Sequence, residues 1–309
     1  MFDFLQRTLD GLLEAGPYAV IGLGLTLSFA VLRRLNLAYG AGALLAAYIG
    51  SWLHTRLGVP VLGVWVGVIV STVIIGMYVE FVCFSNTNNA FQSMQRSRTV
   101  IAGVDEREVT ALAASFALWM QLEQLAVNLQ PNHLHPFPGL ASTSVWAIGS
   151  LTLRPDRLTV FILTAVMVML LALWLERSAV GLGLRAVADE PAAAHLCGMK
   201  VSNLHRIGFA LSCAICGLAS CAVLSIDGQV TPMFGMWVLL KSLTAALLGG
   251  LGSIRGVLWG AVALGITESH AQAVWGAIGR DAATWTLLLL ALLFQARKSK
   301  TLSLGMSHE

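Results

Sequence analysis

The chain has 309 residues, of which 57% are hydrophobic and only 11% charged, and its formal net charge is +3. A soluble domain carries roughly 25% charged residues, so much of this surface is expected to face lipid rather than water. The cations form no basic run with interleaved aromatic residues, which argues against a nucleic-acid partner.

Long uncharged runs recur along the whole chain. A helix that crosses a hydrocarbon core of ~30 Å needs about 20 mostly apolar residues. We therefore predict an all-α, polytopic integral membrane helical bundle with about eight to ten transmembrane helices. The amphipathic segment 2–14 either extends or precedes the first span. The candidate spans, in chain order, are 17–32, 35–55, 59–79, 109–129, 158–175, 207–226, 236–252, 256–277 and 282–296.

The cations between these spans predict the orientation. Arginine and lysine in short loops favour the cytoplasmic side, and alternation places most of them on the side of the C-terminus. The prediction is a multi-pass protein with an external N-terminus and a cytoplasmic C-terminus. Segments 83–108 and 177–206 then lie in the cytoplasm, and the proline-rich segment 130–156 lies outside.

Small residues recur at four-residue spacing in two of the spans. Such spacing lets helix backbones approach closely in a membrane. We expect these residues to pack helices together: Gly42, Ala46 and Gly50 on one face, and Gly252, Gly256 and Gly260 on another.

The segment 177–206 contains a short predicted helix. Glu190 followed by Pro191 is typical of a helix start, and Gly198 of a helix end. The residues between them are small and apolar, including Ala192, Ala193 and Ala194. This helix either packs on its own bundle or docks into a partner.

Several polar residues fall inside or beside the spans. From the helical rise, Lys241 and Glu268 lie at similar depths, and a charge near the bilayer centre is too costly to face lipid unpaired. Three roles are open: a structural ion pair, contact with a substrate, or extension of Lys241 to the interface. Gln121, Gln124 and Asn128 share a helical face, which either lines a water-filled path or lies beyond the hydrocarbon core.

Four stretches resemble the permease family of branched-chain amino acid ABC importers. Ala192–Gly198 is similar to the coupling motif of ABC importer permeases, and Gly181–Glu190 to the lead-in of this family. Lys241–Gly256 resembles the longest family signature, with Glu268 following it. Asn36-Leu-Ala-Tyr39-Gly40 resembles an element of the shorter, LivH type. Arg255 and Tyr39 depart from the family pattern, in which Pro and His are usual.

This resemblance implies a single permease domain over 1–309, with a coupling segment at 177–206, in a bacterial inner membrane. It implies import of branched-chain or hydrophobic amino acids, or of a related small solute such as urea or a small organic acid. Glu190, Ala192, Ala193, Ala194 and Gly198 would contact the ATPase, and Asn36 joins the pathway candidates.

The implied partners are two ABC ATPase subunits, a second homologous permease and an external solute-binding protein. The chain has no GxxxxGK[S/T] phosphate loop, so we expect it to be no enzyme and to need no cofactor or metal. The alternative is an ion-gradient-driven secondary transporter, for which Glu268 would supply a mid-membrane site.

Overall fold

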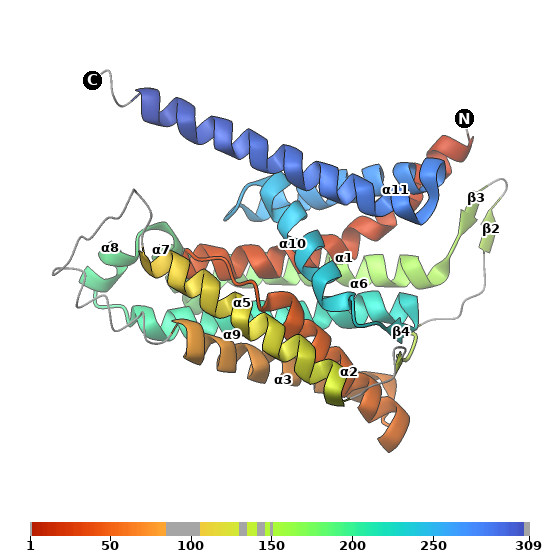
Figure 1. Ribbon diagram of the computed structural model, residues 1–309, viewed down its shortest axis with the longest axis horizontal. Helices are drawn as coiled ribbons and strands as arrows, with labels where there is room; N and C mark the ends of the chain where they lie inside the picture. Colours follow the sequence, from red (N-terminus) through yellow and green to blue (C-terminus); the bar gives the residue numbers. More distant parts are fainter. Residues whose placement is uncertain (1, 85–105, 130–134, 141–145, 149–150, 306–309) are drawn as a thin grey trace.

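The computed structural model describes residues 2–84, 106–129, 135–140, 146–148 and 151–305, and almost all of them are helical (Figure 1). Two pairs of very short antiparallel strands complete the fold, β1 with β4 and β2 with β3. The helices are α1 (Phe2–Leu32), α2 (Tyr39–Leu57), α3 (Val61–Val79), the π-helical turn η1 (Glu80–Phe84), α5 (Glu106–Leu129), α6 (Pro155–Arg177), α7 (Ala179–Asp189), α8 (Pro191–Leu196), α9 (Val201–Asp227), α10 (Phe234–Gly249) and α11 (Ile254–Gly305). The strands are β1 (His135–Pro136), β2 (Trp146–Ile148), β3 (Leu151–Leu153) and β4 (Gln229–Val230).

Helices α1 and α9 form the centre of the bundle. Their most apolar windows are 78% and 72% buried, against 28% in α3, 17% in α6 and 22% in α11. The outer helices turn large apolar side chains outward, such as Trp259 and Phe294, which are 76% and 82% exposed. A water-facing surface would not tolerate so much contiguous apolar area, so these faces are suited to lipid.

Five helices of the described chain are long and apolar enough to cross a membrane by length and composition: α1, α3, α6, α9 and α11. Each of the nine predicted spans coincides with a helix. Helices α2 and α5 are not among the five, α10 is shorter, and α11 is counted once although it corresponds to two predicted spans. The bundle is therefore all-α and polytopic, while the number of eight to ten crossings stays a prediction.

Helix α1 is continuous from Phe2 to Leu32. The amphipathic segment 2–14 therefore extends the first span and does not form a separate element. Pro17 lies inside this helix. Membrane helices tolerate an internal proline because neighbouring groups satisfy the backbone carbonyl that it frees.

Helix α11 reverses direction at Gly276, where φ is 69° and ψ is −154°. This backbone conformation is essentially restricted to glycine. In a straight helix, Glu268 and Thr284 would be separated by ~24 Å along the axis. The Thr284 hydroxyl instead donates a hydrogen bond to the Glu268 carboxylate. The two arms of α11, before and after Gly276, therefore lie against each other, in agreement with two spans predicted there.

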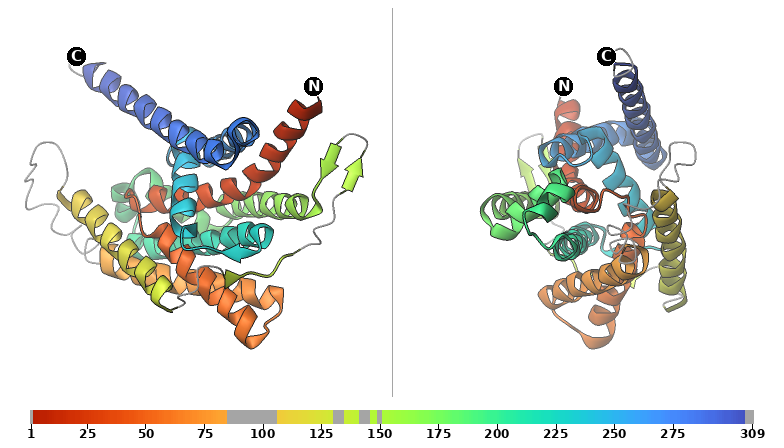
Figure 2. Two further views of the ribbon diagram at one scale, coloured as in Figure 1. Left: turned by 45° about the vertical axis from the view of Figure 1, so that its right-hand side comes forward. Right: turned by 90° about the vertical axis from the view of Figure 1, so that its left-hand side faces the viewer.

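The two ends of the bundle differ. The N-terminus and the β2–β3 strands lie at one end, and α7, α8 and the C-terminal end of α11 lie at the other (Figures 1 and 2). The expected coupling segment 177–206 contains α7, α8 and the first turn of α9, which begins at Val201. Its role in coupling stays a prediction.

Candidate functional site

The buried charges of the bundle meet where α10 approaches the two arms of α11. Lys241 is 2% exposed and Glu268 is fully buried. Their side chains form an ion pair, so the predicted pair is present in the structure. Thr284 bridges them, because the Lys241 ammonium donates to its hydroxyl oxygen at 2.7 Å while that hydroxyl donates to Glu268. Neither charge faces lipid.

Helix α1 and the second arm of α11 complete this network. The Tyr18 hydroxyl donates to Glu268 Oε2 at 2.9 Å and accepts a hydrogen bond of 2.6 Å from Arg280 Nη2. Arg280 Nε lies 3.5 Å from the same carboxylate oxygen. The Lys241 ammonium also lies 5.3 Å from the Tyr18 ring centroid, within cation–π range. We call Tyr18, Lys241, Glu268, Arg280 and Thr284 the buried network.

The buried network continues into a charged cavity of about 120 Å³. Glu14 Oε1 lies 3.1 Å from Arg157 Nη1, and Glu14 Oε2 lies 3.6 Å from Arg280 Nη2. Asp227 at the end of α9 lines the same cavity. Five helices contribute its walls, through Leu13, Glu14, Pro17, Tyr18, Arg157, Val223, Ile226, Asp227, Trp237 and Arg280.

The sequence analysis missed Glu14, Arg157, Asp227 and Arg280 as site residues. They are far apart in the chain and belong to no short motif. A usable signal existed, because each lies next to the end of a predicted span, and alternation places all four ends on the external side. Charges gathered at one end of several helices indicate a site more strongly than any one of them does alone.

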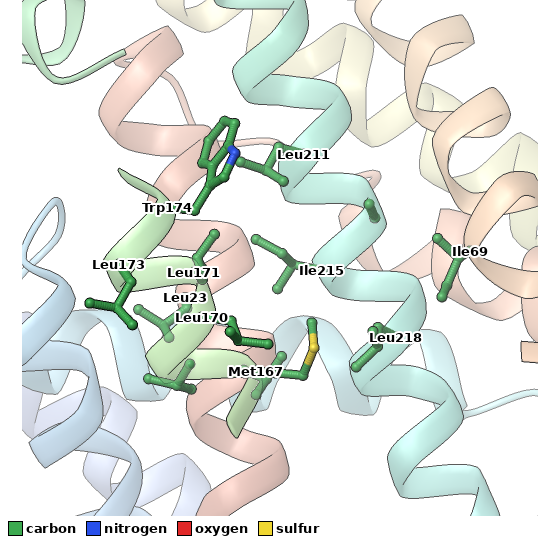
Figure 3. A pocket seen from close by; sticks show the side chains of 13 residues that line it. Leu23, Ile69, Met167, Leu170, Leu171, Leu173, Trp174, Leu211, Ile215 and Leu218 are labelled. Atoms are coloured by element: carbon green, nitrogen blue, oxygen red, sulfur yellow. The ribbon is translucent and has the colours of Figure 1, made fainter. Parts of the chain in front are cut away.

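A large apolar cavity of about 580 Å³ lies elsewhere in the bundle, between α6 and α9 (Figure 3). Leu23 of α1 and Ile69 of α3 complete its lining. The indole N–H of Trp174 is the one conventional hydrogen-bond donor among the side chains that line it. This cavity therefore suits hydrocarbon and is a poor site for a polar solute.

The short helix α8 has the predicted ends. Pro191 occupies its first turn after Glu190, whose side chain forms no capping hydrogen bond. Gly198 has φ of 81°, its N–H donates to the His195 carbonyl at 3.0 Å, and Met199 N–H donates to the Ala194 carbonyl at 3.2 Å. This pair of bonds is a Schellman motif, which ends a helix at a left-handed glycine.

The two faces of α8 have different surroundings. Ala194 is 3% exposed and packs on the protein, whereas Ala192 and Ala193 are exposed. Leu196, at the end of the helix, is 87% exposed. The helix therefore rests on its own bundle along one side and leaves small and apolar side chains uncovered on the other.

Arg33 connects the preceding helix α7 to the end of α1. Its Nη2 donates to the carbonyls of Ala188 and Asp189, at 2.5 and 3.0 Å. Cations at a helix C-terminus satisfy its free carbonyls and complement the helix dipole. Arg33 itself has a positive φ of 55°. Arg33 thus joins the end of α7 to the end of α1, the helix that carries Glu14 and Tyr18.

The expected glycine face around residue 256 is partly wrong. Gly252 has φ of 90° and lies in the turn between α10 and α11, so it shares no helix face with Gly256 and Gly260. Helix α10 ends at Gly249, earlier than the predicted span. Gly256 and Gly260 do lie against α10: an added Cβ would come within 1.9 Å of the Gly249 carbonyl oxygen and 2.3 Å of that of Ala245.

The other candidate positions lie apart from the buried network. An added Cβ at Gly50 would come within 2.4 Å of Val68, whereas at Gly42 the nearest atom is 3.5 Å away. Asn36 is buried and accepts a hydrogen bond from Ala38 N–H ahead of α2. The structure does not bring the polar residues of α5 to the charged cavity; instead their side chains are exposed on that helix: Gln121, Gln124 and Asn128.

The lipid-suited outer faces, the buried charges and the exposed face of α8 together indicate a multi-pass membrane permease. A family described as the permease component of the branched-chain amino acid transport system matches residues 7–296, and the chain belongs to this family. It is the permease component of an ABC transporter and not itself an enzyme. The predicted family resemblance is confirmed.

Two relatives match nearly the whole chain. The high-affinity branched-chain amino acid transport system permease protein BraD of Pseudomonas aeruginosa is 24% identical, over 96% of this chain and 95% of its own. The corresponding protein LivH of Escherichia coli is 24% identical, over 94% of this chain and 93% of its own. The fructose import permease protein FrcC of Rhizobium meliloti is 37% identical, but over only 41% of this chain and 37% of its own.

Proposed function

We propose that this chain forms the translocation pathway of an ATP-driven importer of branched-chain and other hydrophobic amino acids in a bacterial inner membrane. It would act as one domain with a second homologous permease, two ABC ATPase subunits and an external solute-binding protein. The names of the two relatives that cover nearly the whole chain support amino acids as the substrates. The match to the fructose permease covers less than half of the chain, so it gives weaker support for a sugar as the substrate.

The exposed face of α8 is the observation that carries this proposal. A group of exposed apolar side chains on one face of a protein often marks a contact with a partner. The exposed apolar side chains of α8 are those of Leu196, Ala192 and Ala193. The same end of the bundle carries the exposed Lys200, which favours contact with the aqueous phase over contact with lipid. An ATPase subunit that covers this face could move α8, and Arg33 would pass that movement to α1.

The arrangement of the ends agrees with the proposed orientation. Helices α7 and α8 and the C-terminal end of α11 lie at one end of the bundle, and the N-terminus lies at the other. A cytoplasmic α8, where the ATPases would bind, therefore requires a cytoplasmic C-terminus and an external N-terminus. The excess of cations in the loops of the same side favours this assignment.

The buried network argues against the alternative of an ion-gradient-driven transporter. Both carboxylate oxygens of Glu268 are engaged, one by Lys241 and Thr284 and the other by Tyr18. Neither oxygen is therefore open to a coupling ion in this structure. In proteoliposomes, uptake should require ATP and persist when ion gradients are collapsed; the opposite result would establish the alternative.

The test of coupling is Gly198→Val. A β-branched residue is strained at a φ of 81°, so the Schellman motif and the end of α8 should be disrupted. Co-purification of the ATPase subunits and ATP-dependent leucine uptake should both fall at least about tenfold, which corresponds to ~1.4 kcal/mol.

Gly58→Val is the matched control for that variant. Gly58 also has a positive φ, 64°, and like Gly198 it has nothing within 4 Å of an added Cβ, but it ends α2. The substitution introduces comparable backbone strain but leaves α8 unchanged. ATPase binding should therefore persist in this variant. Equal recruitment and uptake in the two variants would contradict the role of α8.

A further inference from the structure

We propose that the charged cavity binds the ammonium and carboxylate groups of a zwitterionic α-amino acid, so that the permease itself selects the substrate. This inference rests on the proposed function, because it takes amino acids as the transported class. It adds a solute-contacting site, made by Glu14, Arg157, Asp227 and Arg280, within the permease chain.

The charges around the cavity match both groups of a zwitterion. Two carboxylates, Glu14 and Asp227, are suited to an ammonium group, and two guanidinium groups, Arg157 and Arg280, to a carboxylate. Guanidinium binds carboxylate through parallel N–H donors, and this geometry is specific. A neutral sugar or urea offers no charge to either kind of group, and a simple anion would meet two carboxylates.

The four charges have hydrogen-bonding capacity left over. Within the described part of the chain, the Asp227 carboxylate has no hydrogen bond or ion pair, and its side chain is exposed at the cavity. Glu14 Oε2, Arg157 Nε and Arg280 Nε are buried without a hydrogen-bond partner in that same part. Buried polar atoms are rarely left without one. A small rotation of these side chains around a zwitterion would supply the missing partners.

The size and the remaining lining suit an aliphatic amino acid. A single water needs only ~10–15 Å³ of such space, so a cavity of about 120 Å³ has room for a larger group. Leu13, Val223 and Ile226 form an apolar part of the wall, and Trp237 lies beside them. The ammonium and carboxylate groups of the amino acid would thus meet the charged part of the cavity, and its short branched side chain would meet the apolar part.

Asp227 is the informative position for mutation. Arg280 also bonds Tyr18, and Glu14 pairs with two arginines, so their removal would disturb the bundle. Among the residues that the structure describes, Asp227 makes no hydrogen bond or ion pair, so its replacement by asparagine breaks no such contact. Glu176 offers a matched control, because it is an exposed carboxylate at the opposite end of α6 from Arg157.

The experiment measures binding to the assembled transporter, the permeases with their ATPases, in nanodiscs without the external binding protein. Isothermal titration would compare L-leucine with leucinol, which keeps only the ammonium group, and 4-methylpentanoate, which keeps only the carboxylate. Leucine should bind at least about tenfold more tightly than either, since each analogue loses a charge-assisted interaction. Asp227→Asn should weaken leucine binding by a similar factor without changing the melting temperature, and Glu176→Gln should leave it unchanged.

Three results would overturn the proposal: no leucine binding to the assembled transporter, equal affinities for leucine and both analogues, or equal leucine binding in Asp227→Asn and Glu176→Gln. The importer function is tested separately, by ATP-dependent leucine uptake in the presence of the binding protein. If the transporter shows ATP-dependent leucine uptake and Asp227→Asn binds leucine as tightly as the unaltered protein, the cavity proposal is rejected and the importer function stands. Leucine binding without ATP-dependent uptake rejects the importer function alone.

Discussion

Replacement of Lys241 by methionine tests whether the buried network holds α10 to α11. Lys241 is 2% exposed, and its loss leaves the fully buried Glu268 carboxylate without its ammonium partner. Removal of one member of a buried pair costs ~3–5 kcal/mol. Glu268 keeps the Tyr18 hydrogen bond of 2.9 Å and has Arg280 Nε at 3.5 Å, so we expect about 3 kcal/mol, at the lower end of that range.

Glu268→Met should cost more, about 5 kcal/mol, because the buried Lys241 ammonium then has no carboxylate partner and Arg280 loses the same carboxylate. The double methionine variant removes both charges and should be at least ~2 kcal/mol more stable than the sum of the single effects predicts. Exchange of the two charges is a poorer test, since a lysine at position 268 would face Arg280.

The assay is reversible unfolding of the purified permease in mixed micelles by SDS titration, followed by tryptophan fluorescence. Lys200→Met, which removes an exposed lysine from the turn before α9, is the control and should change the free energy of unfolding by less than ~0.5 kcal/mol. Equal effects of Lys241→Met and Lys200→Met would refute the reasoning, as would strict additivity in the double variant.

Two further predictions concern packing and coupling. Gly256→Ala should destabilise the fold by ~1–3 kcal/mol, because the new Cβ would lie 1.9 Å from the Gly249 carbonyl oxygen. In Gly42→Ala the nearest atom to the new Cβ is 3.5 Å away, so this variant should be neutral or stabilise the fold by up to ~1 kcal/mol. The same SDS titration measures both, and equal costs would contradict the close approach of α10 and α11. Arg33→Gln should lower leucine uptake per ATP hydrolysed several-fold while the ATPases still bind, since it weakens the hydrogen bonds to the carbonyls of Ala188 and Asp189. Unchanged stoichiometry in reconstituted vesicles would exclude this link.

Local signals explain what could be predicted from the sequence. Apolar runs of membrane-spanning length predicted the helices, because a chain in lipid must satisfy its backbone hydrogen bonds internally. Pro191 and Gly198 predicted both ends of α8, since capping depends on only a few adjacent residues. The similar depths of Lys241 and Glu268 indicated their contact, because depth along a helix follows directly from residue number.

Only the tertiary structure decided which helices are neighbours. Tyr18 and Glu268 are 250 residues apart, and no sequence period predicts that they share a hydrogen bond. Gly252 shows that a sequence period can also mislead. Its four-residue spacing from Gly256 suggested a shared helix face, whereas its positive φ places it in a turn.

The charged cavity depends most on that tertiary arrangement. Glu14, Arg157 and Asp227 are brought together by the packing of α1, α6 and α9, and Arg280 reaches them because the chain reverses at Gly276. The sequence alone determined that this protein is a helical membrane permease and where the short helix α8 begins and ends, because lipid and helix capping act on neighbouring residues. The grouping of charges from four helices required the three-dimensional fold, because side chains distant in sequence meet only through packing.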